Sequence, residues 1–230
     1  LVFLAVAGNE KRAAAGLTRQ NWKSAVLIVL AFVGIYIVRT VVSVAVQGVS
    51  DGSGMQYVKE WAAMFKNPMM WLNIAALPIN YFFVFIAFFG EEYGWRYYLQ
   101  PVLQKRFGLR AGVIILGVVW GLWHIPDDLF YYTQTSGIQM IFAQQITCIS
   151  LGIFFAYAYM KTQNIWVPVC LHYLNNNLIP IISGTFSADV LENQTVSWKD
   201  LPVALVLNGL CFGFFLLADV FKKKEVQEEE

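Results

Sequence analysis

Apolar residues fill six long stretches of this chain, and polar residues collect in the connections between them. A helix that crosses a bilayer needs about 20 mostly apolar residues, and the stretches meet or approach that length. They lie near residues 25–49, 69–100, 111–126, 138–160, 165–183 and 201–221. The pattern therefore predicts an all-α fold, a polytopic bundle of transmembrane helices with six to seven spans.

Two features modify this assignment. The second stretch is long, and we expect a break at Leu77–Pro78, because proline suits the start of a helix better than its interior. The apolar residues 1–7 reach only about 10 Å as a helix. We interpret them as the end of a further span that precedes this sequence.

The composition is that of an integral membrane protein. Hydrophobic residues make up 58% of the 230 residues and charged residues only 13%, against roughly 25% charged in soluble domains. A net charge of +1 without a basic patch argues against a nucleic-acid partner, so the lipid bilayer is the expected surrounding. No polar linker or repeat divides the chain, and we treat residues 1–230 as a single integral-membrane domain.

Basic residues are distributed unevenly over the connections between the expected spans. Only Lys59, Lys66 and Lys199 fall on one side of the bundle. The opposite side holds eleven lysines and arginines, at 8–24, 104–110 and 161–164 and in the C-terminal tail. Because cytoplasmic loops carry the excess of basic residues, we expect the C-terminus in the cytoplasm.

Few ionisable residues lie within the expected spans. The heptapeptide that closes the second span contains Glu91, Glu92 and Arg96. The two histidines of the chain, His124 and His172, lie in the third and fifth spans. A charged group in hydrocarbon costs about 2.5 to 3.5 kcal/mol, so such residues usually face a protein interior or a wet cavity and serve function.

The depths of these residues match. Glu91 lies seventeen residues before Gly108, where the chain turns back, and His124 lies sixteen residues after it. At about 1.5 Å per helical residue the two reach nearly the same layer. His172 and Asn176 reach that layer from the connection at 161–164, so all four can line one pocket.

Helical phase separates their roles. Glu92 and Arg96 are four residues apart and share a face, which predicts an orienting ion pair. Glu91 is turned by about 100° from Glu92 and is left for the cavity. His172 and Asn176 are also four apart and can point at one place.

These residue types suit the hydrolysis of an amide. A carboxylate beside a histidine can hold and deprotonate a water molecule, and a second histidine with an amide can stabilise the resulting oxyanion. No Gly-x-Ser-x-Gly or His-Glu-x-x-His motif occurs, which disfavours a serine nucleophile. A zinc ion held by two histidines and one glutamate stays an alternative by ligand type. The three cysteines, all in apolar stretches, are interpreted as packing residues.

Three further features complete the polar inventory. The patterns Gly90-x-x-x-Gly94 and Gly117-x-x-x-Gly121 would let helix backbones approach closely. Arg39 is expected to extend from its helix toward water. The pair Asp127–Asp128 is interpreted as the polar start of an outer loop, with a role in the site as the alternative.

The three motifs resemble those of the CAAX protease and bacteriocin-processing family, also called the Abi family, which includes the Rce1-type endopeptidases. Its motifs are Glu-Glu-x-x-x-Arg, Phe-x-x-x-His and His-x-x-x-Asn or a small residue, on successive helices. Trp120 replaces the phenylalanine of the second motif, and the match covers about residues 80–180. The motif residues here are Glu91, Glu92, Arg96, His124, His172 and Asn176.

The resemblance implies a membrane-embedded, glutamate-dependent peptidase. It implies that Glu91 and His124 activate water, that His172 and Asn176 form the oxyanion site, and that no metal or other cofactor is required. We expect a peptide or protein substrate, with or without a lipid anchor, as in CAAX-type or bacteriocin processing in a bacterial plasma membrane. The alternative function is a non-catalytic scaffold, receptor or immunity protein whose polar cluster packs helices together.

Overall fold

The structure is a computed structural model that describes residues 8–50, 52, 55–184 and 187–222. It is 83% helical, and no strand occurs in these ranges, so the predicted all-α fold is confirmed. The apolar residues 1–7, which the sequence assigns to a preceding span, lie outside the described residues.

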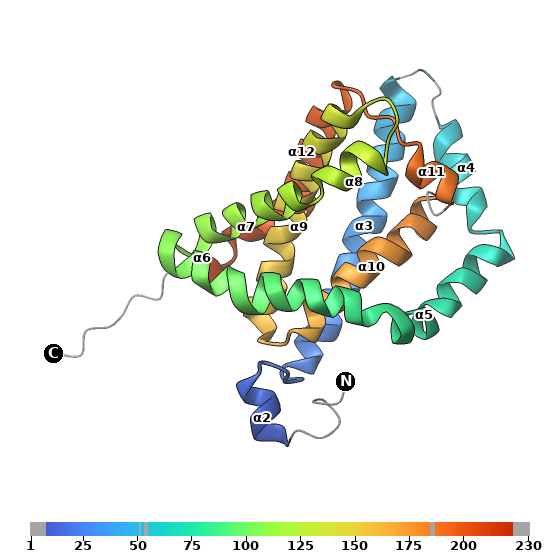
Figure 1. Ribbon diagram of the computed structural model, residues 1–230. Helices are drawn as coiled ribbons and strands as arrows, with labels where there is room; N and C mark the ends of the chain where they lie inside the picture. The colour runs from blue at the N-terminus through green and yellow to red at the C-terminus, as the bar shows by residue number, and fades with distance from the viewer. Residues whose placement is uncertain (1–7, 51, 53–54, 185–186, 223–230) are drawn as a thin grey trace.

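The helices follow one another with short connections (Figure 1). The first half contains α2 (Asn9–Ala14), α3 (Trp22–Ser50), α4 (Gln56–Met64), α5 (Pro68–Glu92), the π-helix η1 (Tyr93–Leu99) and α6 (Gln100–Phe107). The second half contains α7 (Leu109–Trp123), α8 (Ile125–Phe130), α9 (Gly137–Thr162), α10 (Trp166–Ser183), α11 (Ala188–Glu192), α12 (Asp200–Cys211) and the 3-10 turns η2 (Gly213–Leu217) and η3 (Asp219–Phe221).

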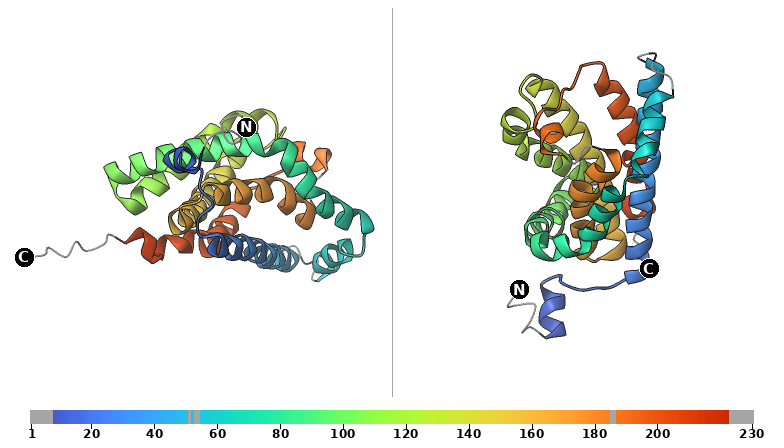
Figure 2. Two further views of the ribbon diagram at one scale, coloured as in Figure 1. Left: turned by 90° about the horizontal axis from the view of Figure 1, so that it is seen from below. Right: turned by 90° about the vertical axis from the view of Figure 1, so that its right-hand side faces the viewer.

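Three layers make up the bundle. The left view of Figure 2 shows α9 and α10 in the middle, with α3 on one side and the run from α5 to α7 on the other. The middle helices contain nearly half of the buried side chains, among them Phe154 and Phe155 on α9 and Leu171 on α10. Of the motif residues, His172 and Asn176 belong to the middle layer, and Glu92, Arg96 and His124 contact it.

Four of the described helical segments are long and apolar enough to cross a membrane: Trp22–Val49, Pro68–Phe107, Leu109–Phe130 and Gly137–Thr162. The expected fifth span forms α10, whose polar residues and buried faces make it an interior helix rather than a lipid-facing one. The expected sixth span, 201–221, is helical only to Cys211 and continues as 3-10 turns. The last two segments thus differ from the uniform spans predicted.

The expected break at Leu77–Pro78 was wrong, because α5 is continuous through Pro78. The proline removes one backbone donor from the helix, and neighbouring groups can satisfy the affected carbonyls in a bundle. The carbonyl that loses its donor is that of Ile74, four residues before the proline. The hydroxyl of Tyr173, on α10, donates at 2.7 Å to a different carbonyl, that of Leu77, and joins this turn of α5 to the middle layer.

Hydrogen bonds tie the connections together in two groups. At one end, Asn164 donates to the carbonyl of Gln20 at 3.1 Å, and Asn21 donates to the carbonyl of Thr162 at 3.0 Å. At the other end, the backbone N–H of Gln194 donates to the carbonyl of Tyr132 at 2.9 Å. The segments at 8–24 and 161–164, both basic, thus share one end of the bundle.

The two glycine patterns differ in their surroundings. A Cβ atom on Gly117 would lie 2.6 Å from the Cα of Ile149, so α7 and α9 approach closely there. A Cβ atom on Gly121 would meet the side chain of Gln145 at 2.5 Å. Gly90 and Gly94 have no such neighbour within 4 Å, so only the pattern on α7 serves helix packing.

Candidate active site

Glu92 is the centre of the polar cluster. Its side chain is fully buried at the end of α5, and each carboxylate oxygen has a different partner. The Nε of Arg96 donates to Oε2 at 2.9 Å, and Nδ1 of His172 lies 2.9 Å from Oε1. The ion pair expected from the four-residue spacing is present, and its carboxylate also orients a histidine of the third motif.

Arg96 is held from several sides, although it is fully buried. It lies in the π-helix η1, and its Nη1 donates to the carbonyl of Gly152 on α9 at 3.2 Å. The guanidinium carbon lies 5.3 Å from the ring of Trp120 and 5.5 Å from that of Phe155. A buried guanidinium is stable only with such partners, so the ion pair depends on α7 and α9 as well as on its own helix.

Trp120 joins the two histidines. Its ring centre lies 5.8 Å from that of His124 and 5.4 Å from that of His172, edge to face in both cases. The aromatic residue that departs from the family pattern therefore still packs on the face expected of it. The structure brings His124, His172 and Glu92 together around one buried indole.

Hydrogen bonds indicate the tautomers of both histidines. Nδ1 of His124 lies 2.8 Å from the carbonyl of Trp120, which can only accept, so Nδ1 carries the proton and Nε2 has the free lone pair. Nδ1 of His172 faces a carboxylate and carries a proton for the same reason. In both rings Nε2 is the atom left for a substrate or a water molecule.

Glu91 adjoins this cluster without being part of its hydrogen bonds. Its side chain is half-buried, unlike that of Glu92. Within the described residues it has no hydrogen-bonded partner. Glu91 directly precedes Glu92 at the end of α5, so its backbone lies beside the cluster. The thiol of Cys148, on α9, lies 3.8 Å from Nδ1 of His124.

Asn176 lies at the edge of the cluster and is exposed. The hydroxyl of Tyr36, on α3, donates to Oδ1 of Asn175, and Nδ2 of Asn175 donates to Oδ1 of Asn176 at 2.9 Å. Because Asn176 accepts through its oxygen, its own Nδ2 remains as a donor for another group. The sequence did not reveal Tyr36 as a partner, since it lies outside the motifs, and Asn175 occupies a variable position of the third motif.

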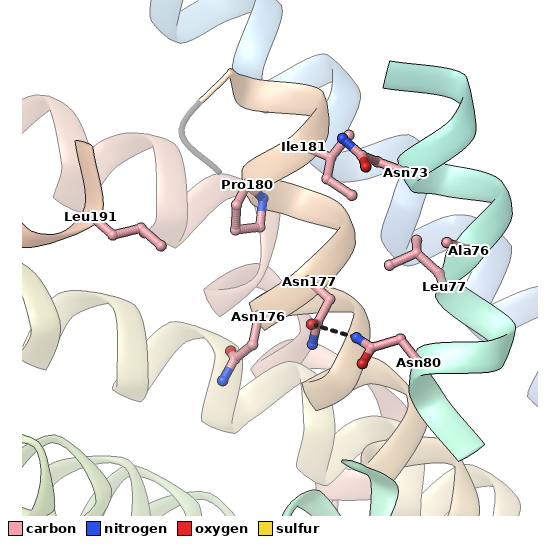
Figure 3. Close-up of a pocket in the computed structure, with 9 residues that line it drawn as sticks. All are labelled: Asn73, Ala76, Leu77, Asn80, Asn176, Asn177, Pro180, Ile181 and Leu191. Carbon is pink, nitrogen blue, oxygen red and sulfur yellow. Dashed lines mark hydrogen bonds between the residues drawn. The ribbon is translucent and has the colours of Figure 1, made fainter. Parts of the chain in front are cut away.

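A cavity of about 460 Å³ opens between α5 and α10 beside Asn176 (Figure 3). Its polar lining consists of carboxamides only, from Asn73, Asn80, Asn176 and Asn177. Asn80 donates to Oδ1 of Asn177 at 3.2 Å, whereas Asn176 points away from that pair in Figure 3. Glu91 and both histidines lie outside this lining, and Asn176 is the member of the predicted site that borders the cavity.

Asp128 differs from the solvated loop residue that the sequence predicted. It lies in α8 with a fully buried side chain, and neither carboxylate oxygen has a hydrogen-bond partner among the described residues. Asp127, by contrast, is exposed. The loop interpretation was wrong for both residues, because α8 contains them, although Asp127 has the solvent exposure that was expected.

The zinc alternative needs at least three ligand side chains around one point. Within the described ranges, no group of three or more His, Cys, Asp or Glu side chains is arranged to hold a metal ion. Glu92 is already bound to Arg96 and His172, so its carboxylate is not free to be the glutamate ligand. The residues present do not fit a metal centre of that kind.

Comparison with known proteins agrees with the motifs. Residues 71–178 match the family described as type II CAAX prenyl endopeptidase Rce1-like. CAAX prenyl protease 2 of Methanococcus maripaludis is 27% identical over 125 residues, which cover 50% of this chain and 45% of that protein. The chain thus spans about half the length of the curated relative it matches, and no solved structure matches it. The resemblance to the Rce1-like family is confirmed, and with four long apolar helices the chain is an integral membrane protein.

Proposed function

We propose, from the similarity to Rce1-like endopeptidases, that this protein is an intramembrane endopeptidase that cleaves a peptide bond with an activated water molecule. The observation that carries the proposal is the arrangement around Trp120. One buried carboxylate holds both Arg96 and His172, and His124 lies on the other edge of the same indole. Holding two histidines with their Nε2 atoms free is the preorganisation that hydrolysis needs.

In the proposed reaction, Glu91 and Nε2 of His124 hold the water. Glu91 takes a proton, and the hydroxide oxygen forms a bond to the carbonyl carbon of the substrate. Collapse of the tetrahedral intermediate breaks the C–N bond, and the proton on Glu91 passes to the leaving amine. No covalent bond to the protein forms at any stage.

The oxyanion of the intermediate would be bound by His172 and Asn176. With Nδ1–H donated to Glu92, His172 donates from Nε2 only as an imidazolium. Arg96, Glu92 and a charged His172 together carry one net positive charge, which stabilises an oxyanion. Nδ2 of Asn176 is the second donor, because its oxygen is already occupied by Asn175.

The substrate is proposed to be a peptide or protein segment that lies along the carboxamide cavity. Side-chain amides both donate and accept hydrogen bonds, as the backbone of an extended peptide requires. The absence of charged side chains from this lining favours an uncharged segment. Whether the substrate has a prenyl group is a separate question that CAAX-type substrates with and without the lipid would answer.

Glu91→Gln tests the proposal directly. The substitution keeps the shape of the side chain and removes the base, so we expect peptide cleavage to fall by at least about 100-fold. Because Glu91 has no hydrogen-bonded partner among the described residues, the unfolding free energy should stay near that of the wild type. Unchanged cleavage would contradict the proposal, and a loss of stability alone would favour a non-catalytic packing role.

A chelator series on the purified protein tests the metal-free assignment. We expect cleavage to be unaffected by EDTA or 1,10-phenanthroline at millimolar concentration. Activity that is lost with chelator and restored by added zinc would overturn it.

A further inference from the structure

Asn80, on α5, lines the carboxamide cavity and has one polar atom without a partner. Its Nδ2 donates to the hydroxyl of Tyr173 at 3.3 Å and to Oδ1 of Asn177 at 3.2 Å, so both N–H bonds of the amide are used. Among the residues that the structure describes, no group donates to its Oδ1, which keeps accessible surface. Figure 3 shows this carboxamide extending from α5 toward α10.

Two backbone carbonyls, which can only accept, fix the orientation of the Asn80 carboxamide. Tyr173 donates its hydroxyl hydrogen to the carbonyl of Leu77 at 2.7 Å, so it offers Asn80 only lone pairs. Asn177 donates from Nδ2 to the backbone carbonyl of Tyr173 at 3.0 Å, so the atom that it turns to Asn80 is its oxygen. Rotating the Asn80 carboxamide by 180° would place its own oxygen against two acceptors. The unpaired atom of Asn80 is therefore an acceptor.

Asn176 offers the complementary group on α10. Its Oδ1 accepts from Asn175, whose own oxygen accepts from Tyr36, so Nδ2 of Asn176 is a donor. Arg39 was expected to extend toward water, and this expectation was wrong. It is half-buried and donates to Oδ1 of Asn208 at 2.8 Å, and its guanidinium carbon lies 5.8 Å from the ring of Tyr36. The cavity thus presents an acceptor on one helix and a held donor on the other.

Apart from its carboxamides, the cavity is apolar. Its other lining residues are Ala76, Leu77, Pro180, Ile181 and Leu191. The acceptor and the donor lie in the same part of the cavity, because Asn80 is hydrogen-bonded to Asn177 and the Cα atoms of Asn176 and Asn177 are about 3.8 Å apart. Every peptide residue except proline has one N–H and one carbonyl. A short extended peptide with apolar side chains therefore has every group that this cavity can bind.

We propose that Asn80 is a substrate-binding residue, whose Oδ1 accepts a hydrogen bond from a backbone N–H of the substrate close to the scissile bond. The inference rests on the proposed function, in which Nδ2 of Asn176 binds the oxyanion. It adds a rule for specificity. The substrate residue at Asn80 has a free N–H and an uncharged side chain, so proline is excluded from that position.

Replacing single N–H groups of a model substrate by ester oxygens tests the proposal. A CAAX-type peptide, prepared with and without a prenyl group, is made as a series in which one backbone N–H at a time is replaced. Fluorescence anisotropy measures the binding of each analogue to Glu91→Gln in detergent micelles. We expect a position near the scissile bond at which the ester weakens binding about tenfold, the effect of one lost hydrogen bond.

The same series on Glu91→Gln combined with Asn80→Ala identifies the partner of that N–H. The parent peptide should bind about tenfold more weakly, and the ester at the sensitive position should have no further effect. Gln134→Ala in the Glu91→Gln background removes an exposed carboxamide outside the cavity and is the matched control, which should keep the full ester effect. A purely structural role of Asn80 would weaken all analogues alike and leave the ester effect in place. If Asn80→Ala does not fold, the series on Glu91→Gln alone still tests for the bonded N–H.

Equal binding of all esters to Glu91→Gln would overturn the proposal, as would an ester effect that persists without Asn80. Failure of both parent peptides to bind would also refute it. Cleavage by the wild-type protein is measured separately. Cleavage without any ester effect on binding would refute the role of Asn80 and leave the proposed function intact. An ester effect that depends on Asn80, without cleavage, would support the role of Asn80 and contradict the proposed function.

Discussion

The buried pair of Glu92 and Arg96 allows a quantitative test of how the cluster is held together. Both side chains have no exposed surface, and their nearest charged atoms are 2.9 Å apart. Arg96→Met leaves a buried carboxylate with His172 as its remaining partner, and Glu92→Gln leaves a buried guanidinium without a counter-ion. Removing one partner of a buried pair typically costs about 3 to 5 kcal/mol of unfolding free energy, and we expect each variant to lose that amount.

The double variant separates the ion pair from the packing around it. With both charges removed, no uncompensated charge remains, so the double variant should be more stable than the sum of the single losses by about 2 to 3 kcal/mol. SDS titration of the detergent-purified protein, monitored by circular dichroism, gives the unfolding free energy of the wild type, the two single variants and the double variant. Additive losses, or single losses below about 1 kcal/mol, would refute the account of Glu92 as a bridging carboxylate. Asp219→Asn removes an ion pair of similar length, 2.7 Å, that is exposed, and should not change stability measurably.

Three other predictions concern the orientation of Asn176, the packing of α7 and the topology. Tyr36→Phe removes the hydrogen-bond donor to Asn175, which in turn orients Asn176. Because Asn176 stays in place and loses only its fixed orientation, kcat for peptide cleavage should fall about tenfold with KM unchanged. A change confined to KM would contradict this. Gly117→Ala should cost about 1 to 3 kcal/mol of unfolding free energy in the same titration, whereas Gly94→Ala, with open space around it, should change it little. Cysteines introduced at Lys105 and Gln134 should label from opposite sides of the membrane, and labelling from the same side would show that the topology is wrong.

The sequence predicted the fold class and the layer of polar residues because both follow from simple periodicity. Apolar runs predict helices, and a rise of about 1.5 Å per residue places Glu91, His124 and His172 at related depths. The spacing of Glu92 and Arg96 predicts their pairing on one face. These inferences need no knowledge of how the helices cross.

Other features depend on tertiary contacts and could not be derived in this way. The bond between Glu92 and His172 joins helices eighty residues apart in sequence, and no periodicity specifies it. The helix α5 continues through Pro78, and the Tyr173 hydroxyl that joins α10 to the Leu77 carbonyl there is not specified by local sequence. Asp128 looks like a loop residue by composition, and only the packing of α8 buries it. The catalytic roles of Glu91, His124, His172 and Asn176 stay predictions until they are measured.

The π-helix η1 implies a constraint on insertions and deletions. Tyr93–Leu99 is wound more loosely than the α-helices on either side, so it contains more residues than an α-helix of that length. Deleting one residue there would let the segment tighten to an α-helix, and the helices on either side would keep nearly the same relative rotation. A further inserted residue cannot be absorbed in this way, and everything beyond it would rotate by about 100° relative to Glu91 and Glu92. Gln100 and α6, which pack against α7, could not follow such a rotation without losing that contact. Homologues with this geometry should therefore tolerate a one-residue deletion in the segment more readily than an insertion.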